Sequence, residues 1–506
     1  FPKIQQRPSS PLLIVSSSTQ RSASSSLKYS LIARNVSLPF EDPHINSAEH
    51  FDERVSDLIA EIVLRFGHNV GQRMVEDNPD SKTEVFSPVS IMAVLSMLML
   101  GAKGGSHKEL QRLFGLESDV ELLNNPAKFY TELGYLLEDM QSHETHGSLR
   151  SRKNAAWRTA RPLYNLRPIL RRQNQEHMEH ITKIANGIFT QSGYSLNPDY
   201  LHSMNSIYNS AVESLDFAGK PVESREYING WVERNTLGKI RNLLKQSLSS
   251  ATKVIIASAL YFKGFWEHRF IQTVDDDFYP NGRNRQPVKM RMMVTTAVFP
   301  YYLSAEYDCK IIGLPYKDNL TTMYVIQPNH STRLKVKQLQ RILDASKIEE
   351  LISKMLRTPA TVALPQMHFV SKMNLKSILS RLGIVDIFTQ DVSDLSLIGG
   401  LDYSRGDDVQ PVASQETLNR LHLDKLESER QSPSSRNAGL FVDEVIHQVD
   451  VDINEEGTEA AAATVALILK GGPGVLFRVD APFLFLIRHD PTKLVLFYGM
   501  VNEPQL

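Results

Sequence analysis

The feature that most limits what this chain can fold into is an unbroken apolar run from Val254 to Phe262, in which Ser258 is the only small polar residue. The run shows no alternation of apolar and polar positions, which predicts a strand buried on both faces. A sheet that contains such a strand needs a layer of packed structure against each face. With 506 residues, the chain is long enough to build a core of that size.

Helices and strands are mixed along the chain. Helical periodicity is expected near 51–66, 87–101, 107–114, 127–140, 198–210, 224–234, 333–355 and 373–382. Strands are expected near 181–190, 254–262, 295–303, 310–315, 321–327, 361–369 and 444–453, with three more before the C-terminus. Because helices and strands do not alternate regularly, the pattern indicates an α+β fold.

Composition and motifs exclude several classes of protein. The 56 Lys and Arg residues nearly balance the 57 Asp and Glu residues, so no bulk charge attracts nucleic acid or a membrane surface. The longest apolar stretch, Ile91–Gly101, is too short to span a bilayer, and the single Cys309 excludes an intrachain disulfide. His177 and His180 lack a third metal ligand, and the chain has no G-x-S-x-G, Walker or H-E-x-x-H motif. Neither an enzyme nor a metal site is predicted.

Residues 1–50 carry twelve serines and five prolines without a period that buries a face, which predicts a flexible N-terminal extension. The chain begins at Phe1, so we expect that a leader peptide has been removed. Three N-glycosylation sequons begin at Asn35, Asn319 and Asn329. These features favour a secreted, extracellular protein.

Two segments break the pattern: a basic one over about 141–180 and a polar one over about 400–438. The basic segment has three glutamates against eight cationic residues, namely Arg150, Arg152, Lys153, Arg158, Arg161, Arg167, Arg171 and Arg172. Clustered arginines beside Trp157 and Tyr164 are typical of a surface that binds polyanions, including glycosaminoglycan or nucleic acid. A flexible, solvated insertion with no ligand is the alternative, and the sequence leaves both open.

A run of small residues follows the strand expected at 444–453. The four consecutive alanines Ala460–Ala463 suit a short helix, because alanine is the best helix former. Counted with a period of two, the same run has a second interpretation. One set of positions, which begins with Thr458 and Ala460, is small and uncharged throughout, and Glu459 belongs to the other set. The segment is therefore also able to enter a sheet as a central strand, with Gly457 as a flexible entrance.

The chain resembles the serpins over about 51–140, 181–399 and 439–506. The motifs that carry the resemblance, in chain order, are Phe86–Ile91 (FSPVSI), Leu100–Gly104 (LGAKG), Ile228–Val232 (INGWV), Thr236–Ile240 (TLGKI), Tyr261–Glu267 (YFKGFWE), Pro482–Ile487 (PFLFLI) and Phe497–Pro504 (FYGMVNEP). Each motif alone is moderately specific, and their common order is strongly so.

The resemblance implies a single serpin domain over 51–506, with three β-sheets, eight or nine helices and an exposed reactive-centre loop at about 455–479. A target serine protease would attack this loop and form an acyl-enzyme. The cut loop would then enter the main sheet and distort the protease, and serpin loop insertion is itself an established example of strand addition. A monomeric inhibitor without a cofactor, except for a possible glycosaminoglycan activator, is expected.

The N-terminal extension and the two insertions are similar to those of insect serpins that restrain protease cascades in melanisation and innate immunity. The alternative is a serpin that no longer inhibits and acts as a carrier, a chaperone or a polyanion-binding protein.

The resemblance also assigns residues of the loop. The hinge comprises Gly457, Thr458, Glu459, Ala460, Ala461, Ala462, Ala463 and Thr464, and no bulky, charged or proline residue stands on its inserting side. Family spacing places the cut at Gly471–Gly472, whereas Lys470 suits a trypsin-like pocket and Leu469 a chymotrypsin-like one. We rank Lys470 first, which makes the expected target trypsin-like.

The shutter and breach of the main sheet are assigned in the same way, to Ser87, Ser90, Ser258, His447 and Trp266. Serpins commonly have an asparagine where Ser258 stands, bonded to the histidine that His447 matches. Because serine is shorter, we expect this bond to be rearranged or bridged by water.

Overall fold

The structure, a computed structural model, describes residues 52–141, 180–317, 320–400, 415–432, 439–455 and 474–505. The chain divides into residues 1–49 and residues 50–506. The predicted N-terminal extension lies outside the described residues, and so does almost all of the basic insertion.

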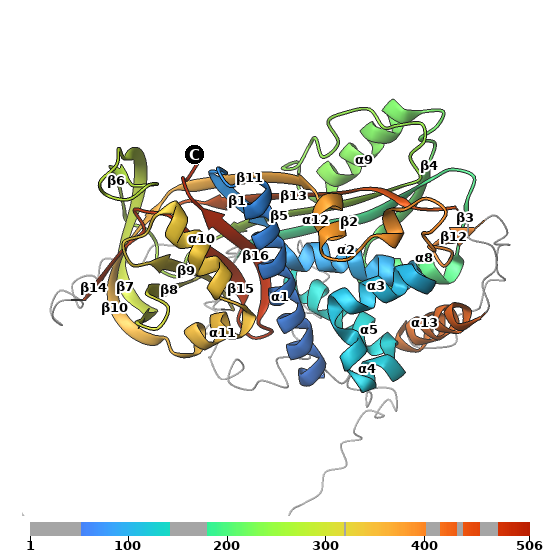
Figure 1. The fold of residues 1–506 in the computed structure, drawn as a ribbon, viewed down its shortest axis with the longest axis horizontal. Coiled ribbons are helices and arrows are strands. Elements are labelled where there is room, and N and C mark those ends of the chain that lie inside the picture. Colours follow the sequence, from blue (N-terminus) through green and yellow to red (C-terminus); the bar gives the residue numbers. More distant parts are fainter. Residues whose placement is uncertain are drawn as a thin grey trace, which may run out of the picture. The chain divides into compact units, whose positions relative to one another are not determined.

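A five-stranded sheet contains β5, the strand formed by the apolar run that begins at Val254 (Figure 1). Its order is β11-β13-β5-β2-β4, with bounds Met367–Asn374, Val442–Ile453, Val254–Gly264, His180–Gln191 and Ala211–Leu215. In β5 every residue except Lys263 is buried, which confirms the prediction of a strand covered on both faces. β5 pairs antiparallel with β2 but parallel with β13.

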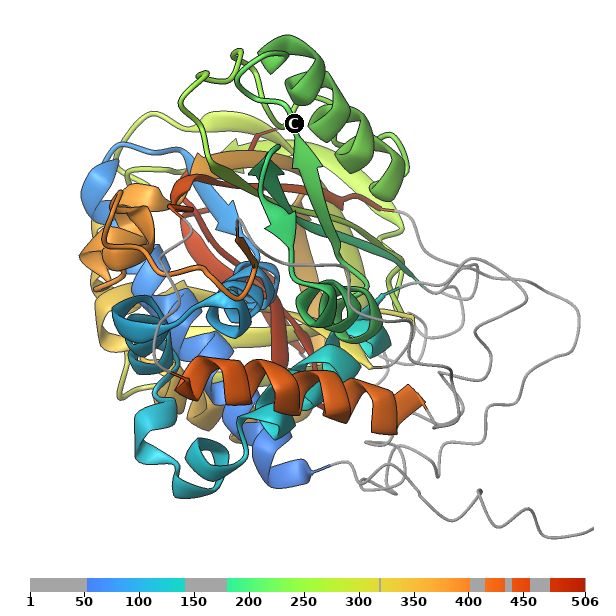
Figure 2. The same ribbon diagram turned by 90° about the vertical axis from the view of Figure 1, so that its right-hand side faces the viewer.

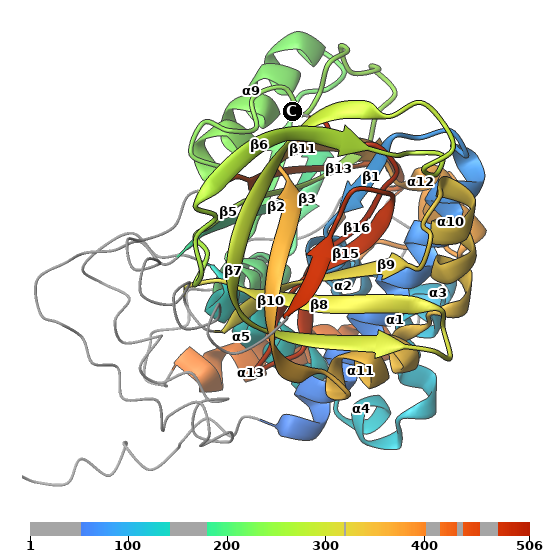
Figure 3. The ribbon, with the colours of Figure 1, turned by 90° about the vertical axis from the view of Figure 1, so that its left-hand side faces the viewer.

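Nine further strands form a second sheet, and two short strands form a third (Figure 3). The path of the second sheet is β1 (Thr83–Phe86), β16 (Leu494–Val501), β15 (Phe483–His489), β9 (Thr321–Pro328), β8 (Cys309–Pro315), β7 (Val288–Ser304), β10 (Leu356–Pro365) and β14 (Val475–Arg478), and β6 (Gln272–Phe278) pairs with β7. The third sheet pairs β3 (Ser195–Leu196) with β12 (Gly399–Gly400). The predicted α+β class with three sheets is confirmed.

The described residues form eleven α-helices. They are α1 (Glu53–Asp77), α2 (Pro88–Gly101), α3 (Gly104–Phe114), α4 (Val120–Asn124), α5 (Pro126–Met140), α8 (Pro198–Tyr208), α9 (Pro221–Asn235), α10 (Arg333–Ile342), α11 (Ala345–Ser353), α12 (Lys376–Arg381) and α13 (Gln415–Gln431). Two of them, α4 and α12, are only 5 and 6 residues long, which accounts for most of the excess over the expected eight or nine. None of the described helices is both long and apolar enough to cross a bilayer.

Helices cover both faces of the five-stranded sheet (Figures 1 and 2). On one face, Ile228 and Val232 of α9 form a buried cluster with Ile255 and Ala257 of β5. On the other face α2 contacts β5 and β2, and it also contacts β16 of the second sheet. The sequence explains where α2 begins, because the Ser87 side chain accepts a hydrogen bond from the backbone N–H of Ser90 and Pro88 occupies the first turn. All of α2 is buried.

Two predicted elements are each divided in the structure. The strand expected at 361–369 is the end of β10 and the start of β11, which belong to different sheets and meet at Gln366. The helix expected at 333–355 is α10 followed by α11. Asp344 separates them, because its side chain accepts a hydrogen bond from the backbone N–H of Lys347 and so begins a new helix.

The polar insertion contains a helix that the sequence analysis did not identify, α13. Of its described residues, only Leu423 and Leu426 are buried apolar side chains, and Leu421 is exposed. Two buried leucines on a polar helix give too narrow an apolar stripe to be recognised from periodicity.

The close packing of β16 against β15 predicts that Gly499 of β16 cannot be replaced by a larger residue without a loss of stability. A Cβ at Gly499 would lie 2.3 Å from a ring carbon of the buried Phe485. Gly499→Ala is therefore expected to lower the free energy of unfolding by about 1–3 kcal/mol through overpacking. In the control Gly230→Ala, within α9, the new Cβ meets only the end of the flexible Arg234 side chain, and stability should rise by about 0.5–1 kcal/mol. Urea unfolding of both variants checks this, and equal stabilities would contradict it.

Candidate functional site

The candidate site is the boundary between β13 and β5, where a new strand would have to enter. His447 of β13 lies opposite Ser258 of β5 in the parallel register. Both side chains are fully buried. The sequence analysis assigned these two residues through a resemblance, and the structure places them in contact.

A directed chain of hydrogen bonds runs through this boundary. The backbone N–H of Ser87 donates to His447 Nε2 at 3.0 Å, so Nε2 carries no hydrogen. The neutral ring therefore carries its hydrogen on Nδ1, which donates to Ser258 Oγ at 3.0 Å. The imidazole thus joins the N-terminus of α2 to both strands.

The same chain continues to β2. Ser90 Oγ donates to Asn186 Oδ1 at 3.1 Å, and it lies 2.9 Å from Ser258 Oγ. Since the hydrogen of Ser90 is used on Asn186, Ser258 must donate to Ser90. The five side chains and backbone groups form one ordered series that links α2, β13, β5 and β2.

Of the two expected arrangements, a rearranged bond or a water bridge, the structure does not show the bridge: Ser258 and His447 are in direct contact. Asn186, which lies beside Ser258 in the antiparallel register of β2 and β5, brings a carboxamide into the network. The sequence analysis missed Asn186. The available signal was a carboxamide in the middle of a predicted strand, but its neighbours in the sheet were unknown.

Burial keeps His447 neutral. It lowers the pKa of this imidazole to about 3, although the nearby backbone of Ser258 acts in the opposite direction. Protonation would place a charge in the core and would remove the acceptor for the Ser87 N–H.

Trp266 holds the chain where it leaves β13. Its indole N–H donates to the carbonyl oxygen of Asn454 at 2.8 Å, and its ring stacks on Tyr316 with 4.5 Å between ring centroids. One residue further on, Glu455 accepts a hydrogen bond from the Gln366 side chain at 3.0 Å. Two hydrogen bonds therefore secure the end of β13 directly before the expected loop.

The hinge residues Gly457–Thr464 and the scissile candidates Leu469–Gly472 lie outside the described residues. The described chain stops at Glu455, after β13 of the five-stranded sheet. It resumes at Gly474 before β14, which pairs parallel with β10 of the nine-stranded sheet. The segment between them therefore connects two different sheets.

The remaining predicted residues divide in the same way. The eight basic residues Arg150–Arg172 and the sequons at Asn35 and Asn319 lie outside the described residues. Asn329 is described, and its side-chain amide donates to Asp308 at 2.9 Å. The hydroxyl of Ser331, the third residue of that sequon, is buried and donates to the Pro482 carbonyl oxygen at 2.6 Å.

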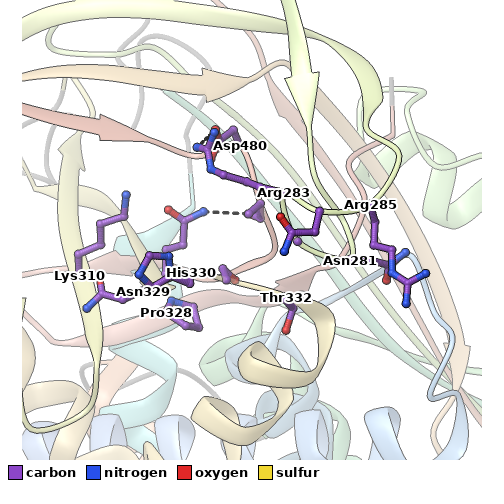
Figure 4. A pocket seen from close by; sticks show the side chains of 14 residues that line it. Asn281, Arg283, Arg285, Lys310, Pro328, Asn329, His330, Thr332 and Asp480 are labelled. Carbon is purple, nitrogen blue, oxygen red and sulfur yellow. Dashed lines mark hydrogen bonds and ion pairs between the residues drawn. The ribbon is translucent and has the colours of Figure 1, made fainter.

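Asn329 also lines a cavity of about 810 Å³ beside the nine-stranded sheet (Figure 4). Arg283 on its wall forms an ion pair with the buried Asp480. Arg478 forms a second ion pair with the same carboxylate at 2.9 Å. Burial lowers the pKa of Lys310, another lining residue. Among the residues that line this cavity, Asn329 is the only one that the sequence analysis assigned to a site.

The buried imidazole predicts how stability depends on pH. The folded-state pKa of His447, about 3, lies below the unfolded value of about 6.5, so the unfolded chain binds the proton first. The contribution of His447 is complete above pH 6.5 and is lost at up to about 1.4 kcal/mol per pH unit as the pH falls toward 3. In His447→Gln, the free energy of unfolding should depend less steeply on pH between pH 6 and pH 4, by the amount that one titrating proton contributes. Urea unfolding measures this dependence. His330→Gln, at an exposed position, is the control, and equal slopes in the two variants would contradict the assignment.

Comparisons with known proteins agree with this architecture. Residues 61–504 match the model of the family Serpin (serine protease inhibitor). The chain is 40% identical over 470 residues to serine protease inhibitor 28Dc of Drosophila melanogaster, which covers 92% of this chain and 83% of the relative. It is 30% identical to leukocyte elastase inhibitor A of Mus musculus, over 87% of this chain and 97% of the relative.

Among solved structures, uncleaved ovalbumin is similar in fold, with a TM-score of 0.67 at 23% identity over 88% of this chain and 100% of that one. The order of the strands, the motifs and these comparisons lead to one conclusion. The chain belongs to the serpin family of serine protease inhibitors.

Proposed function

We propose that this protein inhibits a serine endopeptidase as a suicide substrate. The serine of the protease attacks the carbonyl carbon of the scissile residue, the peptide bond breaks, and the new amine leaves with the C-terminal fragment. The N-terminal part of the loop stays bonded to the protease as an ester. The cleaved loop then enters the sheet between β13 and β5. The observation that carries the proposal is that the small-residue run directly follows β13, one of the two strands that flank this position.

The direction of the strands supports insertion at this place. β13 and β5 are parallel to each other. A strand that follows β13 through a turn is antiparallel to it, and between the two it would be antiparallel to both. Insertion would replace one parallel interface with two antiparallel ones, which are slightly more stable per residue.

Two hydrogen bonds near the boundary must change before the loop enters the sheet. Trp266 must release or move with the Asn454 carbonyl as the chain after β13 turns back. The His447–Ser258 bond crosses the boundary directly and must break before a strand passes between its partners. A buried neutral hydrogen bond contributes about 0.5–1.5 kcal/mol net, so these bonds close the sheet without preventing its opening.

We also propose that the protein acts outside the cell, as a monomer, on a trypsin-like protease. The three sequons support secretion. The Drosophila relative, which is named a serine protease inhibitor, supports a serine protease as the target. Binding of a polyanion by the basic insertion remains part of this proposal, supported by the eight cationic residues of that segment.

Insertion predicts that one set of hinge positions excludes charge. In Thr458→Arg a guanidinium would have to enter the sheet unpaired, at a cost of several kcal/mol. We expect this variant to be cut as an ordinary substrate. The matched control, Glu459→Arg, places the same charge on the alternate face and should still form a covalent complex that survives SDS.

The measurement is a gel of each protein after reaction with trypsin, together with melting of the cleaved chain. Mass spectrometry of the fragments separates cutting at the scissile bond from cutting after the introduced arginine, and only molecules cut at the scissile bond are compared. A Thr458→Arg variant that trapped protease as well as wild type would contradict insertion. A wild-type protein that is cut with no complex and no rise in melting temperature would indicate the non-inhibitory alternative.

The choice of Lys470 as the scissile residue predicts the identity of the released peptide. With a trypsin-like protease, mass spectrometry should find a C-terminal fragment that begins at Gly471. Lys470→Gln removes the ammonium group that such a pocket binds, and should lower the rate of inhibition by at least about tenfold, a loss of 1.4 kcal/mol or more. A fragment that begins at Gly472 or Lys470 would assign the bond to the alternatives Gly471–Gly472 or Leu469–Lys470.

A further inference from the structure

Helix α13, formed by the polar insertion, lies across α8 on the side of the molecule that faces the viewer in Figure 2. Two leucines of α13, Leu423 and Leu426, are buried. In the chain, α13 follows β12, which pairs with β3 directly before α8, and it precedes β13. The helix therefore belongs to the connection between β12 of the two-stranded sheet and β13 of the five-stranded sheet.

The first turn of α8 is one attachment point. Asp199 accepts from His422 and also forms an ion pair with Lys425 at 3.4 Å. Asn197, the N-cap residue of α8, donates to the Glu429 carboxylate at 3.2 Å. These bonds fix α13 to the helix that connects β2 and β3 to β4.

The C-terminus of α2 is the other attachment point. The Arg430 guanidinium donates to the carbonyl oxygens of Leu100 at 2.7 Å and Ala102 at 3.1 Å, and its side chain is only 7% exposed. Lys103 donates in return to the Glu429 carbonyl oxygen at 2.7 Å. A cation at the last carbonyls of a helix is stabilised both by hydrogen bonds and by the helix dipole.

These two attachment points belong to parts that must separate if a strand enters the sheet. One inserted strand widens the gap between β13 and β5 by about 4.8 Å. β5, β2 and β4 then move away from β13, and α8 moves with β2 and β4 because the chain joins them. α2 also contacts β5, β2 and α8, so these contacts must slide as the moving strands separate. Its packing on β16 of the other sheet and its bond to His447 at the N-terminus hold α2 with the opposite side.

We infer that α13 is a latch between α8 and α2 that resists opening of the sheet at the β13–β5 boundary and so limits the rate of loop entry. The effect on loop entry rests on the proposed function, whereas the restraint on the sheet is a property of the uncleaved protein. α2 is then held at both ends, by the His447 network at its N-terminus and by Arg430 at its C-terminus.

Amide hydrogen exchange on the full-length, uncleaved protein tests the latch. Arg430→Met keeps an apolar stem and removes the bonds to α2. We expect the amides of β5 and β13 to exchange about tenfold faster, because hydrogen bonds to a charged group are lost. The exchange rates of the amides in β15 and β16 should not change. The matched control is Arg420→Met, an exposed arginine on the same helix. Equal exchange of β5 and β13 in the two variants would overturn the latch.

A second variant keeps the test decisive if Arg430→Met does not fold. Asp199→Asn preserves the shape of the side chain but weakens the contacts to His422 and Lys425, and it leaves the α2 contacts in place. It should also speed exchange selectively in β5 and β13. Faster exchange that extends equally to β15 and β16 would indicate general destabilisation and would overturn the latch.

Loop entry is followed separately, as the rate at which protease-cleaved protein acquires resistance to heat. Arg430→Met should acquire it about tenfold faster than Arg420→Met, in line with the exchange rates. If cleaved wild type never gains heat resistance but exchange differs between the variants, the proposed function fails and the latch stands. If cleaved wild type gains resistance and the variants are identical in both assays, the latch fails and the proposed function stands.

Discussion

A neutral imidazole between two parallel strands is the contact on which the rest of the arrangement depends. His447 accepts from the backbone of α2 and donates to Ser258, so a single buried side chain determines how two strands and a helix meet. Because burial lowers its pKa to about 3, the ring stays neutral in the folded protein near pH 7 and presents one hydrogen-bond donor and one acceptor. In the same network Ser258 donates to Ser90, Ser90 donates to Asn186, and the Asn186 side-chain oxygen accepts.

The boundary is also weak in a specific way. Around His447 and Ser258 both strands are buried, so the sheet does not open to water at this point. However, the polar contact that joins these two side chains is a neutral hydrogen bond of modest net strength. Stronger, charged contacts lie around the edge of the same layer, between α13 and its two neighbouring helices. A closed sheet with a weak centre and a stronger surround is compatible with a protein that must open once, and only after cleavage.

Local signals in the sequence predicted much of this fold. The apolar run of β5 and the Ser87 cap of α2 were each readable from a few neighbouring residues. The serpin motifs then placed His447 and Ser258 at one boundary. Asn186 was not predicted, because its role depends on the register of β2 against β5, which no local pattern encodes. α13 was not predicted either, because its stability comes from Asp199 and the α2 carbonyls rather than from an apolar stripe.

The pairing of β13 with β5 has a consequence for how the chain folds. Ser258 and His447 are separated by 189 residues, so their strands meet only by closing a very long loop. The segment after β13, by contrast, needs only a turn to lie against it, and hairpins form in about 1–10 μs. During synthesis β5 is complete long before β13 emerges from the ribosome, and it is already available when β13 appears. The order in which the two strands leave the ribosome thus favours the pairing of β13 with β5, its distant partner in the sequence.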